Sequence, residues 1–417
     1  MEIKREFLLK RLIDARHNGM IKVITGMRRC GKSYLLFNLF ADALKAEGVD
    51  SEHIIQVNLE DRRNKSLRDP DMLMSYIDSR LKDENMHYVL LDEVQYVSEF
   101  EDVLNSYLHV RNADVYVTGS NARFLSKDVI TEFRGRGLEV RVHPLSFREI
   151  RGARPDEPIE RLWIEYMTYG GLPQVITMNS DQEKVDYLKG LFKHTYLKDI
   201  KERYDIKLDG DLEELISTLA STVGGLTNPR KLADTFRTVK KSTISQDTIK
   251  AYIDYLQDAF IIERALRFDI KGKRYIDTPS KFYFEDLGVR NALLNFRQVE
   301  KTHLMENAIY NELRTRGMAV DVGEVIWNTK DDEGKNIRKT LEVDFVCNQG
   351  YRRSYIQSAF SIPDEEKRNQ ELQSLRRIDD SFQKIVITGD HCARYQNDDG
   401  ILFIDIYDFM MNTDSVI

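Results

Sequence analysis

The residues best suited to chemistry form a short loop near the N-terminus, Gly26-Met27-Arg28-Arg29-Cys30-Gly31-Lys32-Ser33. The loop has the spacing GxxxxGK[ST], follows the apolar stretch Ile21–Thr25 and precedes a stretch of helical periodicity. Its glycines allow successive backbone N–H groups to face nucleotide phosphates, while Lys32 would reach the β- and γ-phosphates and the Ser33 hydroxyl would bind Mg²⁺. We therefore expect ATP and Mg²⁺ as cofactors, with Lys32 also catalytic. The expected nucleotide-binding residues are Gly26, Met27, Arg28, Arg29, Cys30, Gly31, Lys32, Ser33 and Tyr34.

A second candidate element is the apolar run Tyr88–Leu91, which ends in Asp92 and Glu93. Asp92 is suited to bind Mg²⁺ through its water ligands, so Ser33 and Asp92 are the expected metal site. Glu93 could polarise the attacking water in an in-line hydrolysis. An acidic pair after a buried strand can also simply begin a loop, but the upstream phosphate loop favours the chemical role. A carboxylate at Glu93 indicates hydrolysis rather than tight nucleotide binding alone.

Two polar segments further along the chain add candidate catalytic side chains. The strand-like Val115–Thr118 leads to Asn121, which could orient the lytic water or contact the γ-phosphate; alternatively, Ser120 or Asn121 caps a following helix. In the segment Phe133–Gly137, Arg136 could neutralise transition-state charge, either in the same subunit or across an interface. A solvated basic loop is the alternative interpretation of that segment.

The elements that must position these residues alternate between strand-like and helix-like patterns. Short runs rich in β-branched and aromatic residues predict strands, and the amphipathic stretches between them predict helices. This alternation indicates an α/β fold with a parallel sheet and helices on both faces. The predicted strands are Ile21–Thr25, His53–Leu59, Tyr88–Leu91 and Asp114–Thr118, and two of the helices are Ser33–Glu47 and Asp71–Leu81.

Composition limits the remaining possibilities. The 417 residues include 62 Lys and Arg against 69 Asp and Glu, a net charge of −7, and are 41% hydrophobic. This length predicts two to four folded domains, and the charge excludes a surface coated with basic residues but not a local basic patch. The three cysteines, Cys30, Cys347 and Cys392, cannot form a disulfide framework. With no signal peptide or apolar stretch of about 18 residues, we expect a soluble cytoplasmic protein with no membrane partner.

These motifs together resemble a large family of bacterial and archaeal ATPases with an AAA-type domain, here residues 1–150, followed by a domain of unknown function. The resemblance covers nearly the whole chain, and its ATPase motifs are highly specific. The matching AAA motifs are Gly26–Ser33, Val89–Gln95, Thr118–Ser120 and Pro144–Glu149. The matching C-terminal motifs are Tyr196–Ile200, Glu285–Gly288, Glu306-Asn307 and Glu342–Phe345.

The middle of the chain is predicted to be helical. Residues 159–225 show a break at Gly170–Pro173, and residues 211–266 have the spacing of a helix-turn-helix followed by a small β-wing, as the family resemblance also suggests. Its recognition helix would begin at Gln246, next to Lys240 and Lys241. Acidic residues on the same helix oppose DNA contact, so a packing or protein-binding role is the alternative.

The last region is predicted to be a second α/β unit. Period two along Leu341–Val346 places Glu342 and Asp344 on one face and Leu341, Val343 and Phe345 on the other. With Glu306 on a preceding helix, the order of acidic residues looks like a restriction-endonuclease type of core, in which such groups bind a divalent metal. Gln357 and Ala359 stand where that core has a metal-binding Glu and a Lys, and no nearby lysine is evident. A degenerate nuclease-like module is therefore expected.

The expected domains are an AAA-type ATPase domain (1–150), a helical connector (151–210), a winged-helix-like domain (211–275) and a nuclease-like domain (276–417). The expected function is Mg²⁺-dependent ATP hydrolysis that drives or gates conformational change on a macromolecular partner, with DNA, protein or a second copy of the chain as candidates. The alternatives are a slow nucleotide-dependent switch and an ATP-gated nuclease.

Overall fold

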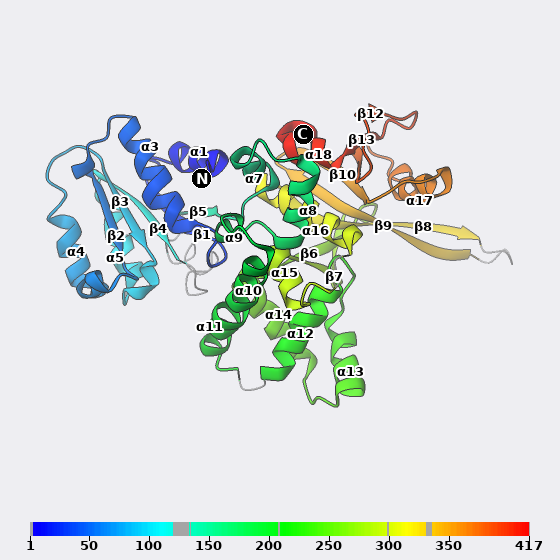
Figure 1. Ribbon diagram of the computed structural model, residues 1–417, viewed down its shortest axis with the longest axis horizontal. Helices are drawn as coiled ribbons and strands as arrows, with labels where there is room; N and C mark the ends of the chain where they lie inside the picture. The colour runs from blue at the N-terminus through cyan, green and yellow to red at the C-terminus, as the bar shows by residue number, and fades with distance from the viewer. Residues whose placement is uncertain are drawn as a thin grey trace. The chain divides into compact units, whose positions relative to one another are not determined.

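The computed structural model describes residues 3–119, 133, 135–206, 209–297, 300–330 and 336–416 (Figure 1). The chain divides into two compact units. Unit 1 comprises Met1–Leu145 with the short segments Leu172–Gln174 and Asp258–Phe260, and unit 2 comprises Ser146–Gly171, Val175–Gln257 and Ile261–Ile417. Among the described helices, none is long and apolar enough to cross a membrane.

Unit 1 contains a five-stranded parallel sheet with the strand order β2-β3-β4-β1-β5. Its strands are β1 (Ile21–Thr25), β2 (Ile54–Asn58), β3 (His87–Asp92), β4 (Ala113–Thr118) and β5 (Gly137–Arg141). The four strands expected from the sequence are present, and the predicted α/β fold with a parallel sheet is confirmed. Strand β5 was not predicted, because it lies at the edge of the sheet, only one of its side chains is fully buried, and it lacks an apolar run.

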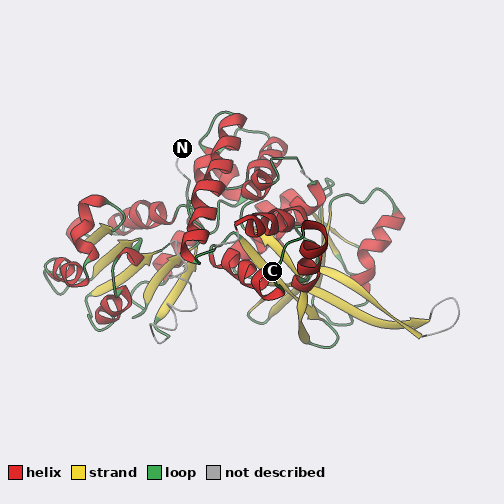
Figure 2. Cartoon of the chain, turned by 90° about the horizontal axis from the view of Figure 1, so that it is seen from below, coloured by secondary structure: helices red, strands yellow, loops and turns green. Residues whose placement is uncertain are grey.

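Helices cover both faces of this sheet (Figure 2). Alternate residues of β3 and β4 explain the two layers: Val89 and Val117 join one core with helices α4 and α5, while Tyr88 and Tyr116 face Phe40 on the other side. The helical elements of unit 1 are α1 (Glu6–Asp14), α2 (Lys32–Tyr34), η1 (Leu35–Phe40), α3 (Ala41–Ala46), η2 (Ser51–His53), η3 (Arg62–Arg68), α4 (Pro70–Asp78), η4 (Val94–Tyr96) and α5 (Phe100–Tyr107).

The chain after Leu145 is mostly helical before it enters a second sheet. The helices are α7 (Phe147–Ala153), α8 (Ile159–Tyr169), α9 (Pro173–Ile176), α10 (Asp181–Leu191), η6 (Phe192–Tyr196), α11 (Leu197–Arg203), α12 (Asp209–Ser221), α13 (Pro229–Lys240), α14 (Gln246–Asp258), α15 (Leu287–Leu293), α16 (Lys301–Thr315), α17 (Glu365–Arg376), α18 (Ile406–Met411) and η7 (Thr413–Val416). Three of them, α12 to α14, match the three helices expected in 211–266.

Two of the sequence motifs in unit 2 meet at the end of α8. The Asp286 carboxylate accepts hydrogen bonds from the N–H of Gly171 at 2.7 Å and of Val289 at 2.9 Å, so it caps α15 and also fixes the chain break after α8. A Cβ at Gly288 would lie 2.0 Å from the carbonyl oxygen of Tyr169, which excludes any larger residue there. Burial raises the pKa of Asp286 to about 6.

The sheet of unit 2 has eight strands in the order β12-β13-β11-β10-β9-β8-β6-β7 and mixes parallel and antiparallel pairs. Its strands are β6 (Ile262–Asp269), β7 (Arg274–Phe284), β8 (Ala319–Lys330), β9 (Asn336–Gln349), β10 (Arg352–Ala359), β11 (Gln383–Thr388), β12 (Tyr395–Gln396) and β13 (Leu402–Asp405). The hairpin β6–β7 stands where a β-wing was expected, but β6 also pairs with β8. The hairpin is therefore the edge of the large sheet, and β7 runs across the expected boundary between residues 275 and 276.

Candidate nucleotide site and an acidic cluster

The phosphate loop begins where β1 ends, and the geometry requires glycine at both glycine positions of the motif. All five residues of β1 are buried, so the strand anchors the loop firmly. Gly26 has φ 137° and a Cβ there would lie 2.1 Å from the carbonyl oxygen of Val142; Gly31 has φ 98°. The helix that starts at Lys32 continues through η1 and α3, as the predicted stretch Ser33–Glu47 requires.

The back of the loop is fixed by contacts that local sequence reasoning missed. The guanidinium of Arg5, which is buried, donates to the carbonyl oxygen of Cys30 at 3.1 Å and to that of His143 at 2.8 Å. The Cys30 thiol is also buried and donates to the carbonyl of Val142 at 3.2 Å. Cys30 thus packs the loop against the end of β5 and has no exposed sulfur for catalysis. Arg5 could not have been found, because its partners are more than 20 residues away along the chain.

The predicted catalytic lysine is bound to neutral oxygens. The Lys32 ammonium, which is 5% exposed, donates to the carbonyl oxygens of Gly26 and Met27, each at 3.0 Å. These acceptors belong to the loop that would surround the phosphates. In the described part of the chain no carboxylate forms an ion pair with Lys32. Its charge is therefore available to an anionic ligand bound at the loop.

A chain of hydrogen bonds joins the phosphate loop to the ends of β3 and β4. The Ser33 hydroxyl donates to the Asp92 carboxylate at 2.9 Å, and the Thr118 hydroxyl donates to the same oxygen at 2.5 Å. The backbone N–H of Glu93 donates to the Thr118 oxygen at 3.0 Å. Burial raises the pKa of Asp92, while the hydrogen bonds from Thr118 and Ser33 act in the opposite direction. Thr118 lies at the end of the strand next to β3; the sequence placed it in a family motif, but its contact with Asp92 was not predicted.

The predicted general base is oriented by a nearby amide. Glu93 has the left-handed conformation, φ 55° and ψ 50°, and its carboxylate accepts a hydrogen bond from the Gln95 side chain. The left-handed turn directs the chain away from the strand immediately after Asp92. The two carboxylates of the acidic pair therefore have different partners, Ser33 and Thr118 for Asp92 and Gln95 for Glu93.

The remaining predicted nucleotide ligands differ in what their side chains offer. Met27 is buried, so only its backbone faces the loop, whereas Tyr34 is 47% exposed. Arg28 lies 3.8 Å from Glu60, and Arg29 has φ 68°. The backbone groups of Met27, Arg28 and Arg29 form part of the loop, as the motif requires.

The structure describes one of the two other predicted catalytic residues, and it lies away from this geometry. Asn121 lies outside the described residues. Arg136 precedes β5, and its carbonyl oxygen accepts the N–H of Ile21 at the start of β1. The phosphate loop follows Thr25 at the other end of β1, roughly 15 Å away at 3.3 Å per residue. Arg136 therefore cannot reach the nucleotide site of its own subunit, and only the alternative across an interface stays a prediction.

The donor set fits a magnesium nucleotide. A hydroxyl and a carboxylate are already hydrogen-bonded to each other at the loop, and oxygen ligands of these types suit Mg²⁺. The ammonium of Lys32 lies within the same loop. Together these groups provide cationic and N–H donors for phosphates and oxygen donors for the metal.

Unit 2 contains a second group of charged side chains, and here the sequence-based expectation that no lysine lies near was wrong. Lys281 of β7 lies among three carboxylates, which we call the acid cluster: Glu306, Glu342 and Asp344. Its ammonium is 2.8 Å from Glu306, 2.7 Å from Glu342 and 3.8 Å from Asp344. The Tyr283 hydroxyl also donates to Glu306, at 2.7 Å. The sequence could not reveal Lys281, since β7 is far from β9 along the chain.

The electrostatics of the acid cluster follow from burial. Burial by itself would lower the pKa of Lys281, but the surrounding carboxylates outweigh it and raise this pKa. Burial raises the pKa of Asp344, and the charge of Glu306 adds to this effect. The carbonyl oxygen of the Gln357 side chain is buried without a hydrogen-bond partner among the described residues, and Ala359 is buried in the core.

The predicted alternation along β9 holds only in part. The pairing of β9 with β8 shifts by one residue, so Val343 and Val346, rather than Val343 and Phe345, join the same core. Phe345 instead packs near Tyr283, with ring centres 6.0 Å apart, on the side that carries Asp344. A β-bulge cannot be inferred from period two, because it depends on the partner strand.

A parallel sheet of this order, with a phosphate loop after β1 and a buried carboxylate as the last residue of β3, defines unit 1 as a P-loop NTPase fold of the AAA type. Comparison with protein families agrees: residues 18–151 match an AAA domain and residues 160–300 match a domain of unknown function. The chain belongs to the family of AAA-domain proteins that carry this C-terminal domain. A family member from Haemophilus influenzae, an uncharacterized protein, is 33% identical over 414 residues, which cover 98% of each chain.

Two more distant proteins are also similar. The uncharacterized protein MJ1544 of Methanocaldococcus jannaschii is 27% identical over 396 residues, covering 88% of this chain and 84% of that protein. The solved structure of the Aeropyrum pernix ORC2 protein is 13% identical, with a TM-score of 0.39, and the match covers 70% of this chain and 91% of that one.

Proposed function

We propose that the protein hydrolyses ATP in a Mg²⁺-dependent reaction and that this cycle drives or gates conformational change in unit 2 on a macromolecular partner. The observation that carries this proposal is the hydrogen-bonded chain of Ser33, Asp92 and Thr118 beside the Lys32 ammonium. It brings the groups for phosphate and metal binding together at one end of the sheet.

Each residue has a separate task in this reaction. Lys32 exchanges its carbonyl partners for phosphate oxygens and neutralises charge on them. Ser33 and Asp92 would hold Mg²⁺, which when bound neutralises the charge that develops on the phosphate oxygens. Glu93 takes the proton of the attacking water, and Gln95 positions the Glu93 carboxylate through its amide.

The direct test is phosphate release by the purified chain, with Glu93→Gln as the main variant. Glutamine preserves the shape and can still accept from Gln95, so we expect ATP affinity to be unchanged and the turnover rate to fall by about 100-fold. The exposed Glu99→Gln is the matched control and should hydrolyse ATP at the wild-type rate. An unchanged rate in Glu93→Gln would remove Glu93 as the base.

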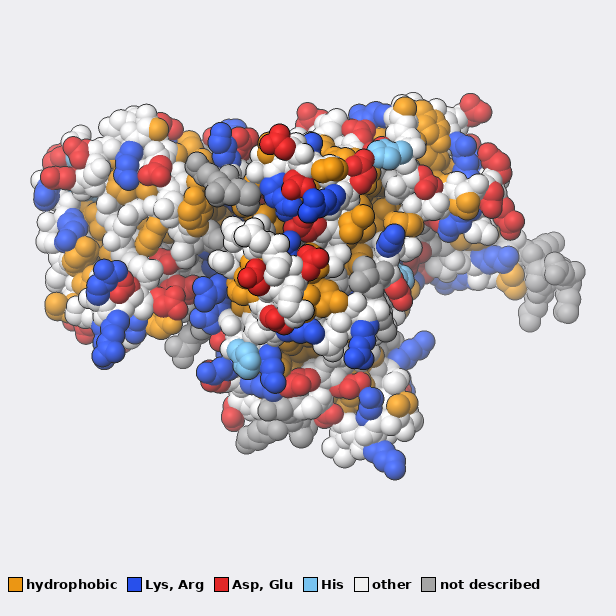
Figure 3. Space-filling view, in the orientation of Figure 1, with side chains coloured by type: hydrophobic (Ala, Val, Ile, Leu, Met, Phe, Trp, Pro, Cys, Tyr) orange, Lys and Arg blue, Asp and Glu red, His pale blue; other side chains and the backbone are white. Residues whose placement is uncertain are grey.

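DNA is a candidate partner, and α13 is the surface that suits it best. This helix exposes Arg230, Lys231, Arg237 and Lys240, and basic side chains gather over it in Figure 3. Arg237 and Lys240 lie near Asp234 and Glu214, so Arg230 and Lys231 offer the more available charges. The helix expected to read DNA, α14, buries much of its surface and exposes Asp247 and Asp254 beside Lys250.

The test of this partner is binding of double- and single-stranded DNA as a function of salt, with and without ATP. The double variant Arg230→Ala/Lys231→Ala should weaken binding and reduce the salt slope by about one per lost phosphate contact. Lys250→Ala on α14 is the control and should bind like the wild type. Wild-type DNA affinity and salt dependence in the double variant would exclude α13 as the DNA-binding surface.

The acid cluster bears on the nuclease alternative. Lys281 lies between carboxylates where a divalent metal would have to bind, and this supports a degenerate nuclease-like module that does not cleave. We expect no nicking of plasmid DNA in Mg²⁺ or Mn²⁺. Nicking that Asp344→Ala abolishes would reverse this assignment.

ATP turnover measured over a range of protein concentrations separates an active ATPase from a slow switch and detects an arginine acting between subunits.

A further inference from the structure

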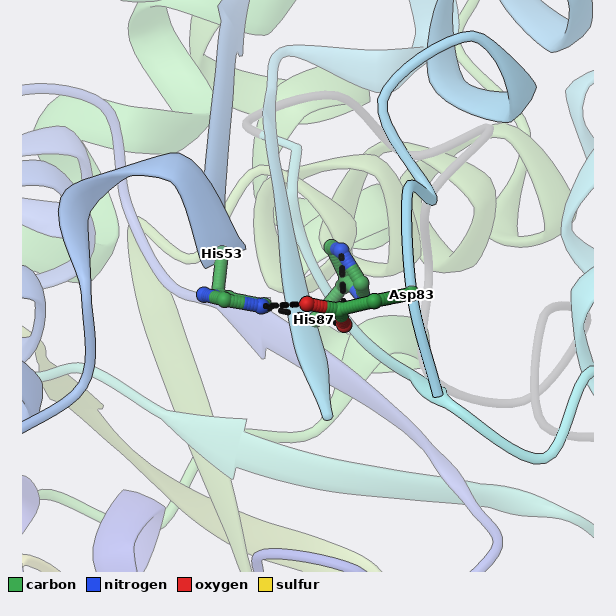
Figure 4. A group of neighbouring side chains, drawn as sticks. All are labelled: His53, Asp83 and His87. Atoms are coloured by element: carbon green, nitrogen blue, oxygen red, sulfur yellow. Dashed lines mark hydrogen bonds and ion pairs between the residues drawn. The ribbon is translucent and has the colours of Figure 1, made fainter. Parts of the chain in front are cut away.

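A second group of metal-ligating side chains lies in unit 1, away from the phosphate loop. His53 ends η2 just before β2, His87 begins β3, and Asp83 lies in the loop before β3. The phosphate loop lies at the other end of the parallel sheet, because it follows the last residue of β1, whereas His53 and His87 lie where β2 and β3 begin. Figure 4 shows the three side chains converging on one point.

The register of the sheet sets the two imidazoles side by side. Ile54 pairs with Tyr88, so the preceding residues, His53 and His87, start neighbouring strands at the same level. Their ring centres are 4.6 Å apart at an angle of 50°. The sheet therefore brings two nitrogen ligands together without help from long, flexible side chains.

The carboxylate completes the group at metal-ligand spacing. Asp83 Oδ2 is 3.0 Å from His53 Nε2, and Asp83 Oδ1 is 4.0 Å from His87 Nε2. One ligand atom from each of the three residues lies within 4.8 Å of the others. Around a tetrahedral ion with bonds of about 2.0–2.1 Å, ligand atoms are about 3.3 Å apart. Small side-chain rotations would reach this geometry.

Contacts behind the ligands orient them toward the shared point. His87 Nδ1 is 2.8 Å from the carbonyl oxygen of Asn85, which only accepts, so Nδ1 donates there and Nε2 is the ring nitrogen directed toward Asp83. Nε2 has no hydrogen-bond partner in the described part of the chain. Asn85 also donates to Asp83 through its backbone and its side-chain amide, at 2.8 and 3.0 Å.

We propose that His53, Asp83 and His87 form a binding site for a divalent transition-metal ion of the Zn²⁺ class, which joins the starting ends of β2 and β3. Two imidazole nitrogens and one carboxylate oxygen suit Zn²⁺ and not Mg²⁺, which prefers oxygen ligands alone. Asp83 is exposed and His53 half-buried, so water can occupy the fourth position. The role is structural, because nothing places this site near the nucleotide.

The test uses metal-stripped full-length protein without nucleotide. Titration calorimetry with Zn²⁺ should give one tight site per chain, and Co²⁺ should produce visible absorption characteristic of a low-coordinate site with nitrogen ligands. His53→Gln and Asp83→Asn should each weaken Zn²⁺ affinity by at least about 10-fold, and Zn²⁺ should raise the thermal midpoint of the wild type more than that of either variant. The exposed His109→Gln is the matched control and should bind like the wild type.

Two results would overturn the proposal: no tight Zn²⁺ binding by the wild type, or tight binding that both ligand variants retain. The second result would place the metal elsewhere, for example at Asp92 and Glu93. Because His53 and Asp83 are not deeply buried, folded variants are expected, and a circular dichroism spectrum checks this. Failure here would leave ATP hydrolysis untouched, since the two sites share no residue.

Discussion

Lys32 in unit 1 and Lys281 in unit 2 are both buried among oxygen atoms, but the charges of those oxygens differ. Lys32 in unit 1 is 5% exposed and Lys281 in unit 2 is 3% exposed, so burial does not distinguish them. Lys32 donates to two neutral backbone carbonyls, whereas Lys281 lies among the three carboxylates of the acid cluster. The first ammonium forms no ion pair with a carboxylate in the described part of the chain, and the second is neutralised by its neighbours.

This difference decides which of the two lysines is suited to bind an anion. Replacing a neutral carbonyl by a phosphate oxygen strengthens the contact of Lys32, because a charge-assisted hydrogen bond is about twice as strong as a neutral one. An anion near Lys281 would have to displace or approach the carboxylates that already bind this ammonium and that would repel the anion. The same type of side chain is therefore suited to bind an anionic ligand at Lys32 and to hold carboxylates together at Lys281.

The largest expected effect comes from removing the structural lysine. Lys281→Met leaves the acid cluster buried without its counter-charge, and breaking a buried ion pair in this way costs about 3–5 kcal/mol of the free energy of unfolding. Urea denaturation measures this loss, while ATP binding by unit 1 should persist below the transition. The exposed Lys250→Met should unfold like the wild type. Wild-type stability of Lys281→Met would mean that the ammonium does not hold the cluster together.

The opposite result is expected for the other lysine. Lys32→Ala removes the cation that meets the phosphates, so ATP turnover should fall by at least about 100-fold, with a smaller loss of stability than in Lys281→Met. Equilibrium binding of a fluorescent ATP analogue and phosphate release check this. Lys45→Ala, an exposed lysine of the same unit, is the control. The comparison fails if Lys32→Ala binds and hydrolyses ATP normally.

A smaller effect tests the hydroxyl that links β3 and β4. Thr118→Val keeps the shape but removes the donor to Asp92 and the acceptor for the Glu93 N–H, which should cost about 2 kcal/mol of stability and raise the Mg²⁺ concentration needed for turnover. Thr25→Val removes another buried hydroxyl, which donates to Glu139 at 2.6 Å, and should lower stability without changing the Mg²⁺ requirement. If the Mg²⁺ dependence of both variants matches the wild type, Thr118 has only a structural role.

The smallest expected effect is a change in the pH dependence of stability in unit 2. Burial raises the pKa of Asp344 above its value in the unfolded chain, so the unfolded chain loses this proton first as pH rises. The contribution of Asp344 to stability is therefore present at low pH, below its ordinary value of about 4, and is lost as pH rises through the raised pKa. Glu306, Glu342 and Lys281 face this carboxyl, and the raised pKa of Lys281 keeps that lysine charged throughout.

Asp344→Asn removes this titration and keeps an oxygen to accept the N–H of Ser358, which lies 2.8 Å from the carboxylate. Its stability relative to the wild type should increase from pH 5 to pH 8, by about 1.4 kcal/mol for each pH unit below the raised pKa of Asp344. Denaturation at several pH values measures the difference, and the exposed Asp379→Asn should follow the wild-type profile. A difference that decreases with pH would contradict the raised pKa.

The fold of unit 1 was largely predictable, because its central strands carry uninterrupted apolar runs. Tyr88–Leu91 and Asp114–Thr118 are buried on both faces, and strands of this kind can be predicted because they form nearly continuous apolar runs in the sequence. Strand β5 escaped prediction because an edge strand needs no such run. In unit 2 the strand around Leu341–Val346 was expected, but the pairing of β6 with β8 was not, since pairing between distant strands leaves no local pattern.

The residues of the candidate nucleotide site that belong to short local motifs could be predicted from the sequence, and the others could not. Gly26, Lys32 and Ser33 follow from one short segment, and Asp92 and Glu93 from the end of one apolar run. Thr118 could have been suggested by its place at the end of the next strand, but its contact with Asp92 depends on β3 and β4 being neighbours. Arg136 was a reasonable candidate by residue type, yet the register of β5 places it at the far end of β1.

The sequence by itself determined the groups that act through backbone conformation and short spacing: the phosphate loop, the acidic pair and the alternation of strands and helices. Only the tertiary structure decided which charges meet. Arg5 behind the loop, Lys281 in the acid cluster, and His53 beside His87 all depend on segments that are distant in the chain but adjacent in space. The reason is physical: local propensity and spacing act within a few residues, whereas electrostatic and metal-binding partners are selected by strand order and register.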